Sequence, residues 1–198
     1  LLTSFASREL IDEFVPKLLN GQYAATMCLT ETQAGSSLSD ISTEATLPKN
    51  SNDKADCYRI QGQKIFISAG DHDVTENIVH LVLAKIKDSP KGTKGISLFA
   101  VPKKRNDTDG HLVSNDVTSI GLVPKMGQHS TPALHLAFGA KDNCFGYLIG
   151  EEGRGLTYMF QLMNTARLGV GLAGTYIASA AYYASLQYAK ERPQGREL

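Results

Sequence analysis

Two stretches decide how this chain folds: residues 27–36 read Met-Cys-Leu-Thr-Glu-Thr-Gln-Ala-Gly-Ser, and residues 64–70 read Lys-Ile-Phe-Ile-Ser-Ala-Gly. Each is a short apolar run that places a hydroxyl residue beside a glycine-containing turn, as expected near the end of a β-strand. Side chains alternate between the two faces of a strand, so Phe66 and Ser68 are expected on one face, as are Cys28 and Thr30. The stretches therefore predict two neighbouring strands that present an aromatic ring and hydroxyl groups together.

Similar short strands are predicted throughout residues 24–150. Turn residues separate the strands, for example Gly62-Gln63 and the polar segments 91–95 and 106–110. Several short strands without helices between them are typical of an antiparallel barrel or sandwich. The predicted strands cover residues 25–30, 41–47, 58–60, 64–68, 78–86, 95–101, 116–123, 133–138 and 146–149.

Helical periodicity marks both ends of the chain. Residues 4–20 form an imperfect amphipathic pattern that contains Pro16, and apolar or small residues recur at helical spacing from about Gly155 to Arg192. The second pattern predicts one helix of roughly 37 residues, about 55 Å long. A stripe of that length is too long for one small barrel to cover, so partner helices are expected on another chain or in further sequence.

These patterns predict an α+β fold with three parts. Residues 1–23 end an N-terminal helical domain, residues 24–150 form a central antiparallel β-barrel, and residues 151–198 begin a C-terminal helical domain. The chain starts at Leu1, without a methionine, and stops at Leu198 just after a basic helix end. We therefore expect it to be a piece of a longer protein.

Composition argues against several classes of function. The 198 residues have a formal net charge of zero, so no basic field suggests nucleic acid or an anionic membrane, and no apolar run has the length of a membrane span. Three cysteines without a CxxC pair argue against a disulfide framework or a zinc site and favour the reducing cytoplasm. The histidines lack ligand spacing, so no metal is expected, and His80 in an apolar strand is expected in the core.

The hydroxyl and aromatic residues of the two opening stretches suggest a redox cofactor. An aromatic face beside hydroxyl donors suits a flat, nitrogen-rich ring such as a flavin, with Thr30 and Ser68 donating to its rim and Phe66 covering one face. Ala34-Gly35-Ser36 adds close backbone approach and a hydroxyl suited to a phosphate or a pantetheine amide. The alternative is structural: the hydroxyls satisfy their own backbone and Phe66 lies in the core.

Five ordered motifs, taken together, resemble the acyl-CoA dehydrogenase family. They are residues 27–36 and 62–68, which resemble the flavin-binding strands, residues 148–156, which resemble the entry into the C-terminal helices, and residues 164–168 and 188–192. Residues 71–73, 77–83 and 95–102 look most like the branch that contains 3-methylmercaptopropionyl-CoA dehydrogenases, to which the alkylation-response flavoproteins are related.

The resemblance implies FAD as the cofactor and an acyl-CoA thioester as the substrate. Phe66 and Ser68 stand where the family often has tryptophan and commonly has threonine, and Arg192 would reach the FAD phosphates of a neighbouring subunit. Asn164 and Arg167 lie one helical turn apart where the family holds CoA, and burial of Arg167 on the apolar helix face would demand an anion. The implied cofactor-binding residues are Met27, Leu29, Thr30, Ser36, Phe66, Ser68, Arg192 and Gln194, and the implied substrate-binding residues are Ser36, Asn164 and Arg167.

The implied reaction is α,β-dehydrogenation of acyl-CoA to trans-2-enoyl-CoA, with hydride transfer to the flavin. An electron-transfer flavoprotein or another acceptor would reoxidise the flavin, and the complete protein would be a homodimer or homotetramer. The family's catalytic glutamate is expected beyond Leu198, and Thr165 occupies the position that a minority of members use. We therefore assign no catalytic residue and expect this chain alone to be inactive. The alternative function is a DNA-associated flavoprotein of the alkylation-response type, which the zero net charge disfavours.

Overall fold

The computed structural model describes residues 1–48 and 57–196 of the chain. These residues form two compact units that meet between Met159 and Phe160, and each unit is described by itself. The first unit contains two short helices and all the strands, and the second consists of most of a long helix and the residues after it.

Two helices open the first unit, where the sequence predicted one. Helix α1 spans Leu2–Phe5 and α2 spans Arg8–Leu19. Ser7 separates them because it adopts an extended backbone and its side chain accepts a hydrogen bond from the Leu10 backbone N–H, as an N-cap residue does. Pro16 lies inside α2 without ending it, and α2 buries Leu10 and Phe14.

The strands that follow are short, apart from β3 and β4, and two 3₁₀ turns interrupt them at Leu38–Asp40 and Gly92–Gly95. The strands are β1 (Tyr23–Cys28), β2 (Glu44–Thr46), β3 (Cys57–Ser68), β4 (Asn77–Ile86), β5 (Ile96–Pro102), β6 (Lys104–Asn106), β7 (Leu112–Ser114), β8 (Val117–Leu122), β9 (Ala133–Phe138) and β10 (Phe145–Leu148).

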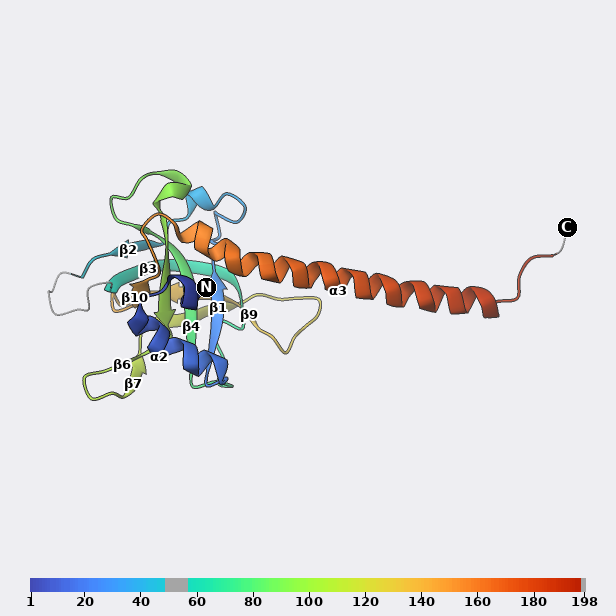
Figure 1. Ribbon diagram of the computed structural model, residues 1–198, viewed down its shortest axis with the longest axis horizontal. Coiled ribbons are helices and arrows are strands. Elements are labelled where there is room, and N and C mark those ends of the chain that lie inside the picture. Colours follow the sequence, from blue (N-terminus) through green and yellow to red (C-terminus); the bar gives the residue numbers. More distant parts are fainter. Residues whose placement is uncertain (49–56, 197–198) are drawn as a thin grey trace. The chain divides into compact units, whose positions relative to one another are not determined.

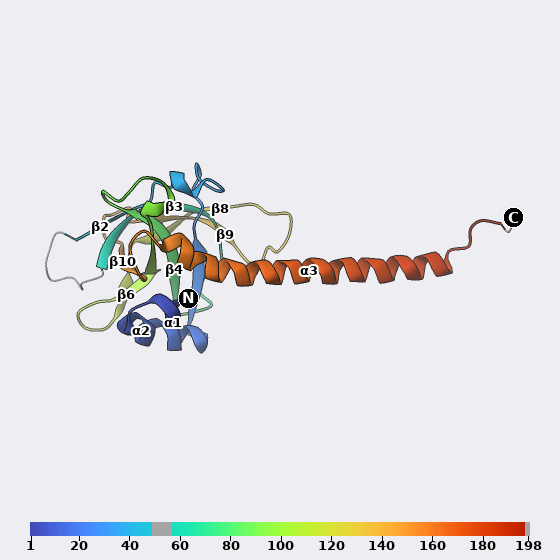
Figure 2. The ribbon, with the colours of Figure 1, turned by 45° about the horizontal axis from the view of Figure 1, so that its top comes forward.

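The main sheet closes into a barrel. Its strands follow the order β1-β4-β5-β10-β3-β9-β8, and β2 pairs with both β3 and β4. Because of this double pairing, β2, β3, β10, β5 and β4 form a closed ring, and Figures 1 and 2 show these strands wrapped around a common interior. The predicted barrel is confirmed, although β1 and β2 each run parallel to β4, whereas the sequence indicated antiparallel pairing alone.

Strand β3 corrects a predicted turn. Gly62-Gln63 does not separate two strands but lies inside one strand of 12 residues. Gly62 is required there because a Cβ atom would lie 2.5 Å from the Thr43 hydroxyl oxygen and 2.7 Å from Thr43 Cα. Gly62 thus permits close packing of the segment that contains Thr43. In the sequence alone, a glycine with this role looks the same as a glycine in a turn.

A small hairpin follows β5. Lys104–Asn106 form β6, which pairs with β7. Arg105 lies over the Phe145 ring, 4.7 Å from its centroid, and is only partly exposed. The predicted turn at 106–110 forms the tip of this hairpin.

The barrel interior is apolar and includes one histidine. Phe99, Val101, Leu136 and Phe138 are among its fully buried side chains. His80 is also fully buried, as predicted, and its Nδ1 lies 2.7 Å from the Thr26 hydroxyl. Burial lowers the pKa of His80 to about 3, so the ring is neutral at physiological pH.

Helix α3 spans Gly155–Glu191, 37 residues, as the periodicity predicted. Its first turn belongs to the first unit, where Tyr158 packs against Phe5 with ring centroids 4.3 Å apart. In the second unit, apolar side chains such as Leu168 and Ile177 are exposed. Arg167 is exposed as well, so its expected burial is not observed in this unit.

Candidate functional site

The segment after β1 forms a tight turn that carries Thr30 and Ser36. Glu31 and Ala34 exchange two backbone hydrogen bonds of 2.9 and 3.1 Å, which reverse the chain immediately after Thr30. Gly35 then passes over the Thr30 side chain, since a Cβ atom on Gly35 would lie 3.8 Å from the Thr30 methyl carbon. Thr30 is half-buried beneath this turn, and Ser36 is exposed.

A β-bulge in β3 determines where Phe66 and Ser68 point. Lys64 pairs with Leu136 of β9, but Ile67 pairs with Leu134, so β3 contains one extra residue between these pairs. Phe66 lies in the bulge with a φ of +62°, in the left-handed region. A one-residue bulge exchanges the two faces of a strand, so residues 66 and 68, which would otherwise face the interior with Lys64, point outward. Phe66 is accordingly 60% exposed, while Ile67 is buried.

A backbone hydrogen bond joins the two predicted stretches. The Ile65 N–H donates to the Thr30 carbonyl at 2.9 Å. Ser68 is three residues further along β3, roughly 10 Å at the rise of a β-strand and less through a bulge. The structure therefore brings the end of β1 and the outward part of β3 side by side.

A buried ion pair lies behind this junction, and sequence reasoning missed it. The Lys64 ammonium donates to Glu31 Oε1 at 2.8 Å and to the Leu29 carbonyl at 3.0 Å. The side chains of Lys64 and Glu31 are 0% and 3% exposed. The signal in the sequence was a lysine at an inward position of an apolar strand, where a charge requires a partner.

The Glu31 carboxylate is fully engaged by its neighbours. Besides Lys64, it accepts hydrogen bonds from the backbone N–H and hydroxyl groups of Ser42 and Thr43 and from the Gln33 amide, at 2.6–3.0 Å. Burial acts to raise the pKa of Glu31, but the Lys64 charge and these hydrogen bonds outweigh it and lower the pKa to about 2. Burial lowers the pKa of Lys64, and the Glu31 charge opposes that shift. The Glu31 carboxylate is therefore ionised at neutral pH.

The outward side of the junction combines exposed apolar groups with hydroxyls. Met27 and Phe66 are 37% and 60% exposed, and Ser68 is exposed on the same outward side of β3 as Phe66. We call Met27, Leu29, Thr30, Phe66 and Ser68 the shelf. Exposed apolar surface beside hydroxyl groups fits a flat aromatic ring with a polar rim, which is the chemistry of a flavin ring.

The remaining predicted site residues lie in the second unit. There the Arg167 guanidinium donates to the Asn164 side-chain oxygen at 3.0 Å and lies over the Phe160 ring. Arg192 lies 3.4 Å from the Tyr188 hydroxyl, and Gln194 follows the end of α3. Asn164 and Arg167 are thus brought together on one helix face, as their spacing indicated.

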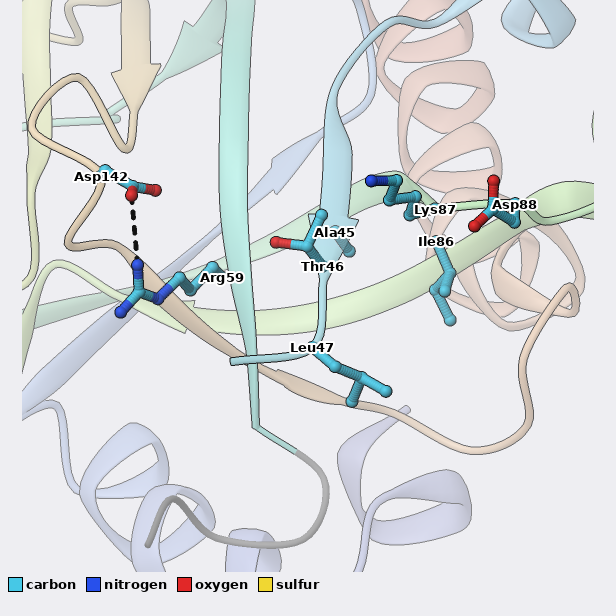
Figure 3. Close-up of a pocket in the computed structure, with 8 residues that line it drawn as sticks. All are labelled: Ala45, Thr46, Leu47, Arg59, Ile86, Lys87, Asp88 and Asp142. Atoms are coloured by element: carbon cyan, nitrogen blue, oxygen red, sulfur yellow. Dashed lines mark hydrogen bonds and ion pairs between the residues drawn. The ribbon is translucent and has the colours of Figure 1, made fainter. Parts of the chain in front are cut away.

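Two cavities of the first unit flank β3 at opposite ends. One of about 280 Å³ lies at the β8–β9 connection beside Ala133, the ladder partner of Ser68. The other, of about 430 Å³, lies between β2, β3 and the end of β4 (Figure 3). Its Arg59 is paired with Asp142 at 3.1 Å, and Lys87 and Asp88 also balance in charge, so it offers no clear anion site.

One group of side chains in the described residues has metal-ligand character. Asp107, Asp109 and His111 lie together at the tip of the β6–β7 hairpin. Hairpin geometry explains the grouping, because Asp107 Oδ1 accepts the backbone N–H groups of Asp109 and His111 at 3.0 and 2.8 Å. Such a turn needs no ion.

Comparison with known proteins decides the family. Residues 26–140 match the model of the acyl-CoA dehydrogenase middle domain. The chain belongs to the acyl-CoA dehydrogenase family. The family match contains the turn after β1, the bulge of β3 and the Lys64–Glu31 pair, so the shelf is part of this middle domain.

The chain is similar over most of its length to parts of longer proteins that are named acyl-CoA dehydrogenases. It is 45% identical over 195 residues to a butyryl-CoA dehydrogenase of Syntrophomonas wolfei, covering 96% of this chain and 31% of that protein. It is 44% identical over 186 residues to the 3-methylmercaptopropionyl-CoA dehydrogenase of Ruegeria pomeroyi, covering 93% of this chain and 30% of that protein. The chain thus spans about a third of the length of these relatives.

A solved structure shows the same fold. The butyryl-CoA dehydrogenase of Megasphaera elsdenii superposes with a TM-score of 0.70 at 25% identity, covering 99% of this chain and 46% of that one. These named relatives are dehydrogenases, so the DNA-associated alternative gains no support. In the part of the chain that the structure describes, no helix combines the length and apolarity needed to span a membrane.

Proposed function

We propose that the chain is the middle domain of an FAD-dependent acyl-CoA dehydrogenase, which converts an acyl-CoA thioester into the trans-2-enoyl-CoA. The observation that carries the proposal is the junction of β1 and β3, where a backbone hydrogen bond joins the Thr30 carbonyl to the Ile65 N–H, next to the outward residues of the β3 bulge. Family membership supports the same reading, because the shelf lies within the matched middle domain.

The shelf residues provide the groups that a flavin ring requires. Phe66 and Met27 would offer apolar surface to one ring face, the Thr30 and Ser68 hydroxyls would donate hydrogen bonds to the polar rim, and the backbone at Met27 and Leu29 would hold the ring edge. Hydrogen bonds to the ring stabilise its electron-rich reduced form more than its oxidised form. FAD, when bound, would accept the β-hydrogen of the substrate as hydride.

Residues outside the shelf would hold the rest of the two ligands. Ser36, exposed after the Gly35 turn, would reach the FAD pyrophosphate or the acyl-CoA chain. Asn164 and Arg167 would hold the CoA moiety, and Arg192 with Gln194 would hold the FAD phosphates of a neighbouring subunit. Positive charge and amide donors suit these phosphate-rich groups.

The base that removes the α-proton of the thioester is not among the shelf residues. Glu31 is the carboxylate nearest to the shelf in sequence, but both its oxygens are engaged behind the strands, and it is buried. A proton acceptor must reach the substrate directly. We therefore assign the described residues to flavin tuning and CoA contact, and the proton transfer to a glutamate in the C-terminal helical region of the complete protein.

The relatives suggest the size of the substrate and the partners. Three relatives at 42–45% identity are named for butyryl-CoA or 3-methylmercaptopropionyl-CoA, so we propose a short acyl chain. We also propose an electron-transfer flavoprotein as acceptor, a homodimer or homotetramer, and a cytoplasmic location, to which the buried thiols of Cys28 and Cys144 are suited.

The test is FAD binding and flavin reduction in the complete protein. Ser68→Ala should slow flavin reduction by butyryl-CoA about tenfold in stopped-flow absorbance, with little change in butyryl-CoA affinity, because one hydrogen bond to the reduced ring is lost. Ser119→Ala, which removes an exposed hydroxyl from β8, is the matched control and should leave both unchanged. Equal reduction rates in all three proteins would contradict the role of Ser68, and failure of the parent to bind FAD would contradict the function.

A further inference from the structure

The buried Lys64–Glu31 pair is placed so that it fixes the shelf from behind. The three consecutive residues that follow β1 are each hydrogen-bonded to Lys64 or to its neighbour Ile65. The Leu29 carbonyl accepts from the Lys64 ammonium at 3.0 Å, the Thr30 carbonyl accepts from the Ile65 N–H at 2.9 Å, and the Glu31 carboxylate accepts from Lys64 at 2.8 Å. Lys64 is also the residue directly before the bulge. The pair therefore fixes Thr30 relative to Phe66 and Ser68.

The same carboxylate ties a second segment to the shelf. Glu31 accepts hydrogen bonds from Ser42 and Thr43, which precede β2, and from Gln33 within the turn. That turn leads directly into Gly35 and Ser36. One carboxylate thus holds the end of β1, the turn before Ser36 and the entry into β2 in one arrangement.

Stability alone does not explain why an ion pair is buried at this site. Removing two charges from water is costly, and a pair of well-packed apolar residues at such a site is often equally or more stabilising. The neighbouring interior is apolar and includes Cys28 of β1 and Ile67 of β3, both of which are buried. An ion pair is directional where an apolar contact is not, so it is suited to fixing a geometry.

We propose that Lys64 and Glu31 are positioning residues for FAD, which hold the Thr30 hydroxyl and the β3 bulge in the spacing that the flavin ring requires. This inference rests on the proposed function. Neither residue touches the ring, since both are buried behind the strands, and they act through Thr30, Phe66 and Ser68.

Removal of Lys64 should make flavin binding sensitive to pH. In Lys64→Met, the Glu31 carboxylate remains buried without its counter-charge, while Ser42, Thr43 and Gln33 are neutral donors. Cys28, the other titratable group beside Lys64, is a neutral thiol, because burial raises its pKa to about 12. Asp40 contributes only its backbone carbonyl to this network, through Gln33. Ionisation of Glu31 would then open the turn, so FAD affinity should fall as pH rises.

The experiment measures FAD affinity and the flavin reduction potential of the complete protein at pH 5.5 and pH 8. In the parent, FAD affinity should be nearly equal at the two pH values. In Lys64→Met, the FAD dissociation constant should rise about tenfold or more at pH 8, and less at pH 5.5, with a shifted potential. Arg59→Met, which breaks an ion pair at the other end of β3, is the matched control and should behave as the parent.

A double variant separates positioning from folding. Lys64→Met with Glu31→Gln removes both charges and should fold, as circular dichroism can verify, but it lacks the bond from Lys64 to Leu29. It should bind FAD more weakly than the parent by about tenfold, without the pH dependence of Lys64→Met. A folded double variant with the affinity and potential of the parent would overturn the inference alone. A parent protein that does not bind FAD would overturn the proposed function instead.

Discussion

At the scale of single residues, the backbone of Phe66 is the most unusual feature of the shelf. Its φ of +62° is rare for a bulky residue and costs about 1 kcal/mol or more. The ring is mostly exposed, so it regains little of this cost by burial within the described chain. Strain of this kind concentrates at functional sites, and here it accompanies the outward turn of the side chain.

Phe66→Gly and Phe66→Ala should therefore differ in stability but not in function. Both variants lose the ring, so both should bind FAD more weakly. Only glycine adopts a positive φ without strain, so Phe66→Gly should have a free energy of unfolding about 1 kcal/mol higher than Phe66→Ala. Urea denaturation measures the difference, and equal stability of the two variants would show that the backbone at position 66 is not strained.

Glu31 should make the protein sensitive to acid. Its pKa is lowered from 4.5 to about 2 in the folded state, so it stabilises the fold above pH 4.5, and this contribution is lost as pH falls through about 2. The loss should be on the order of 3 kcal/mol, measured as the free energy of unfolding in urea between pH 5 and pH 2. Lys64→Met with Glu31→Gln should show a shallower pH dependence. An identical dependence in that double variant would rule out Glu31 as the cause.

The shelf residues could be proposed from the sequence, but the ion pair behind them could not. Thr30, Phe66 and Ser68 were recognisable because hydroxyl and aromatic residues at strand ends are a local pattern. The Lys64–Glu31 pair was missed because it joins residues 33 positions apart, and a lysine in a strand is usually solvent-exposed. Only the three-dimensional pairing shows that both charges are buried.

At the scale of secondary-structure elements, the bulge of β3 is the decisive feature. Simple alternation correctly placed Phe66 and Ser68 on one side, but alternation from Lys64 would place them in the interior. The extra residue corrects the register so that Ile67 enters the core. The bulge depends on the pairing of β3 with β9, so it cannot be predicted from the sequence of β3 alone.

Gly62 offers a test of how closely β3 packs on its neighbour. Gly62→Ala would place a Cβ atom 2.5 Å from the Thr43 hydroxyl oxygen and should cost about 2 kcal/mol or more in unfolding free energy. Thr43 also binds Glu31, so FAD affinity should fall as well. Gly121→Ala is the control, because its nearest contact is the His135 Cβ at 3.6 Å, and it should change stability by less than about 1 kcal/mol. A Gly62→Ala variant as stable as the control would contradict this packing.

At the scale of the whole molecule, the barrel was predictable and its closure was not. Recurrent short strands indicated a barrel, and helical periodicity gave the 37 residues of α3 almost to the residue. The closing role of β2, a strand of three residues paired on both edges, arises from tertiary contacts that no local pattern encodes.

The 198-residue chain by itself should not oxidise acyl-CoA. Its shelf residues carry no carboxylate, and Glu31 is engaged behind them, so within the described part of the chain no base is placed at the shelf for proton removal. Incubation of the chain with FAD, butyryl-CoA and an artificial electron acceptor should give no turnover above that of free FAD. Turnover comparable to that of the complete protein would show that the base lies within these residues.

The most direct test of the account is a crystal structure of the complete protein with FAD bound. The flavin ring should lie against Phe66, with the Thr30 and Ser68 hydroxyl oxygens about 3 Å from its polar atoms. A ring bound elsewhere, for example in the cavity beside Arg59 and Asp142, with Thr30 and Ser68 directed away from it, would contradict the account.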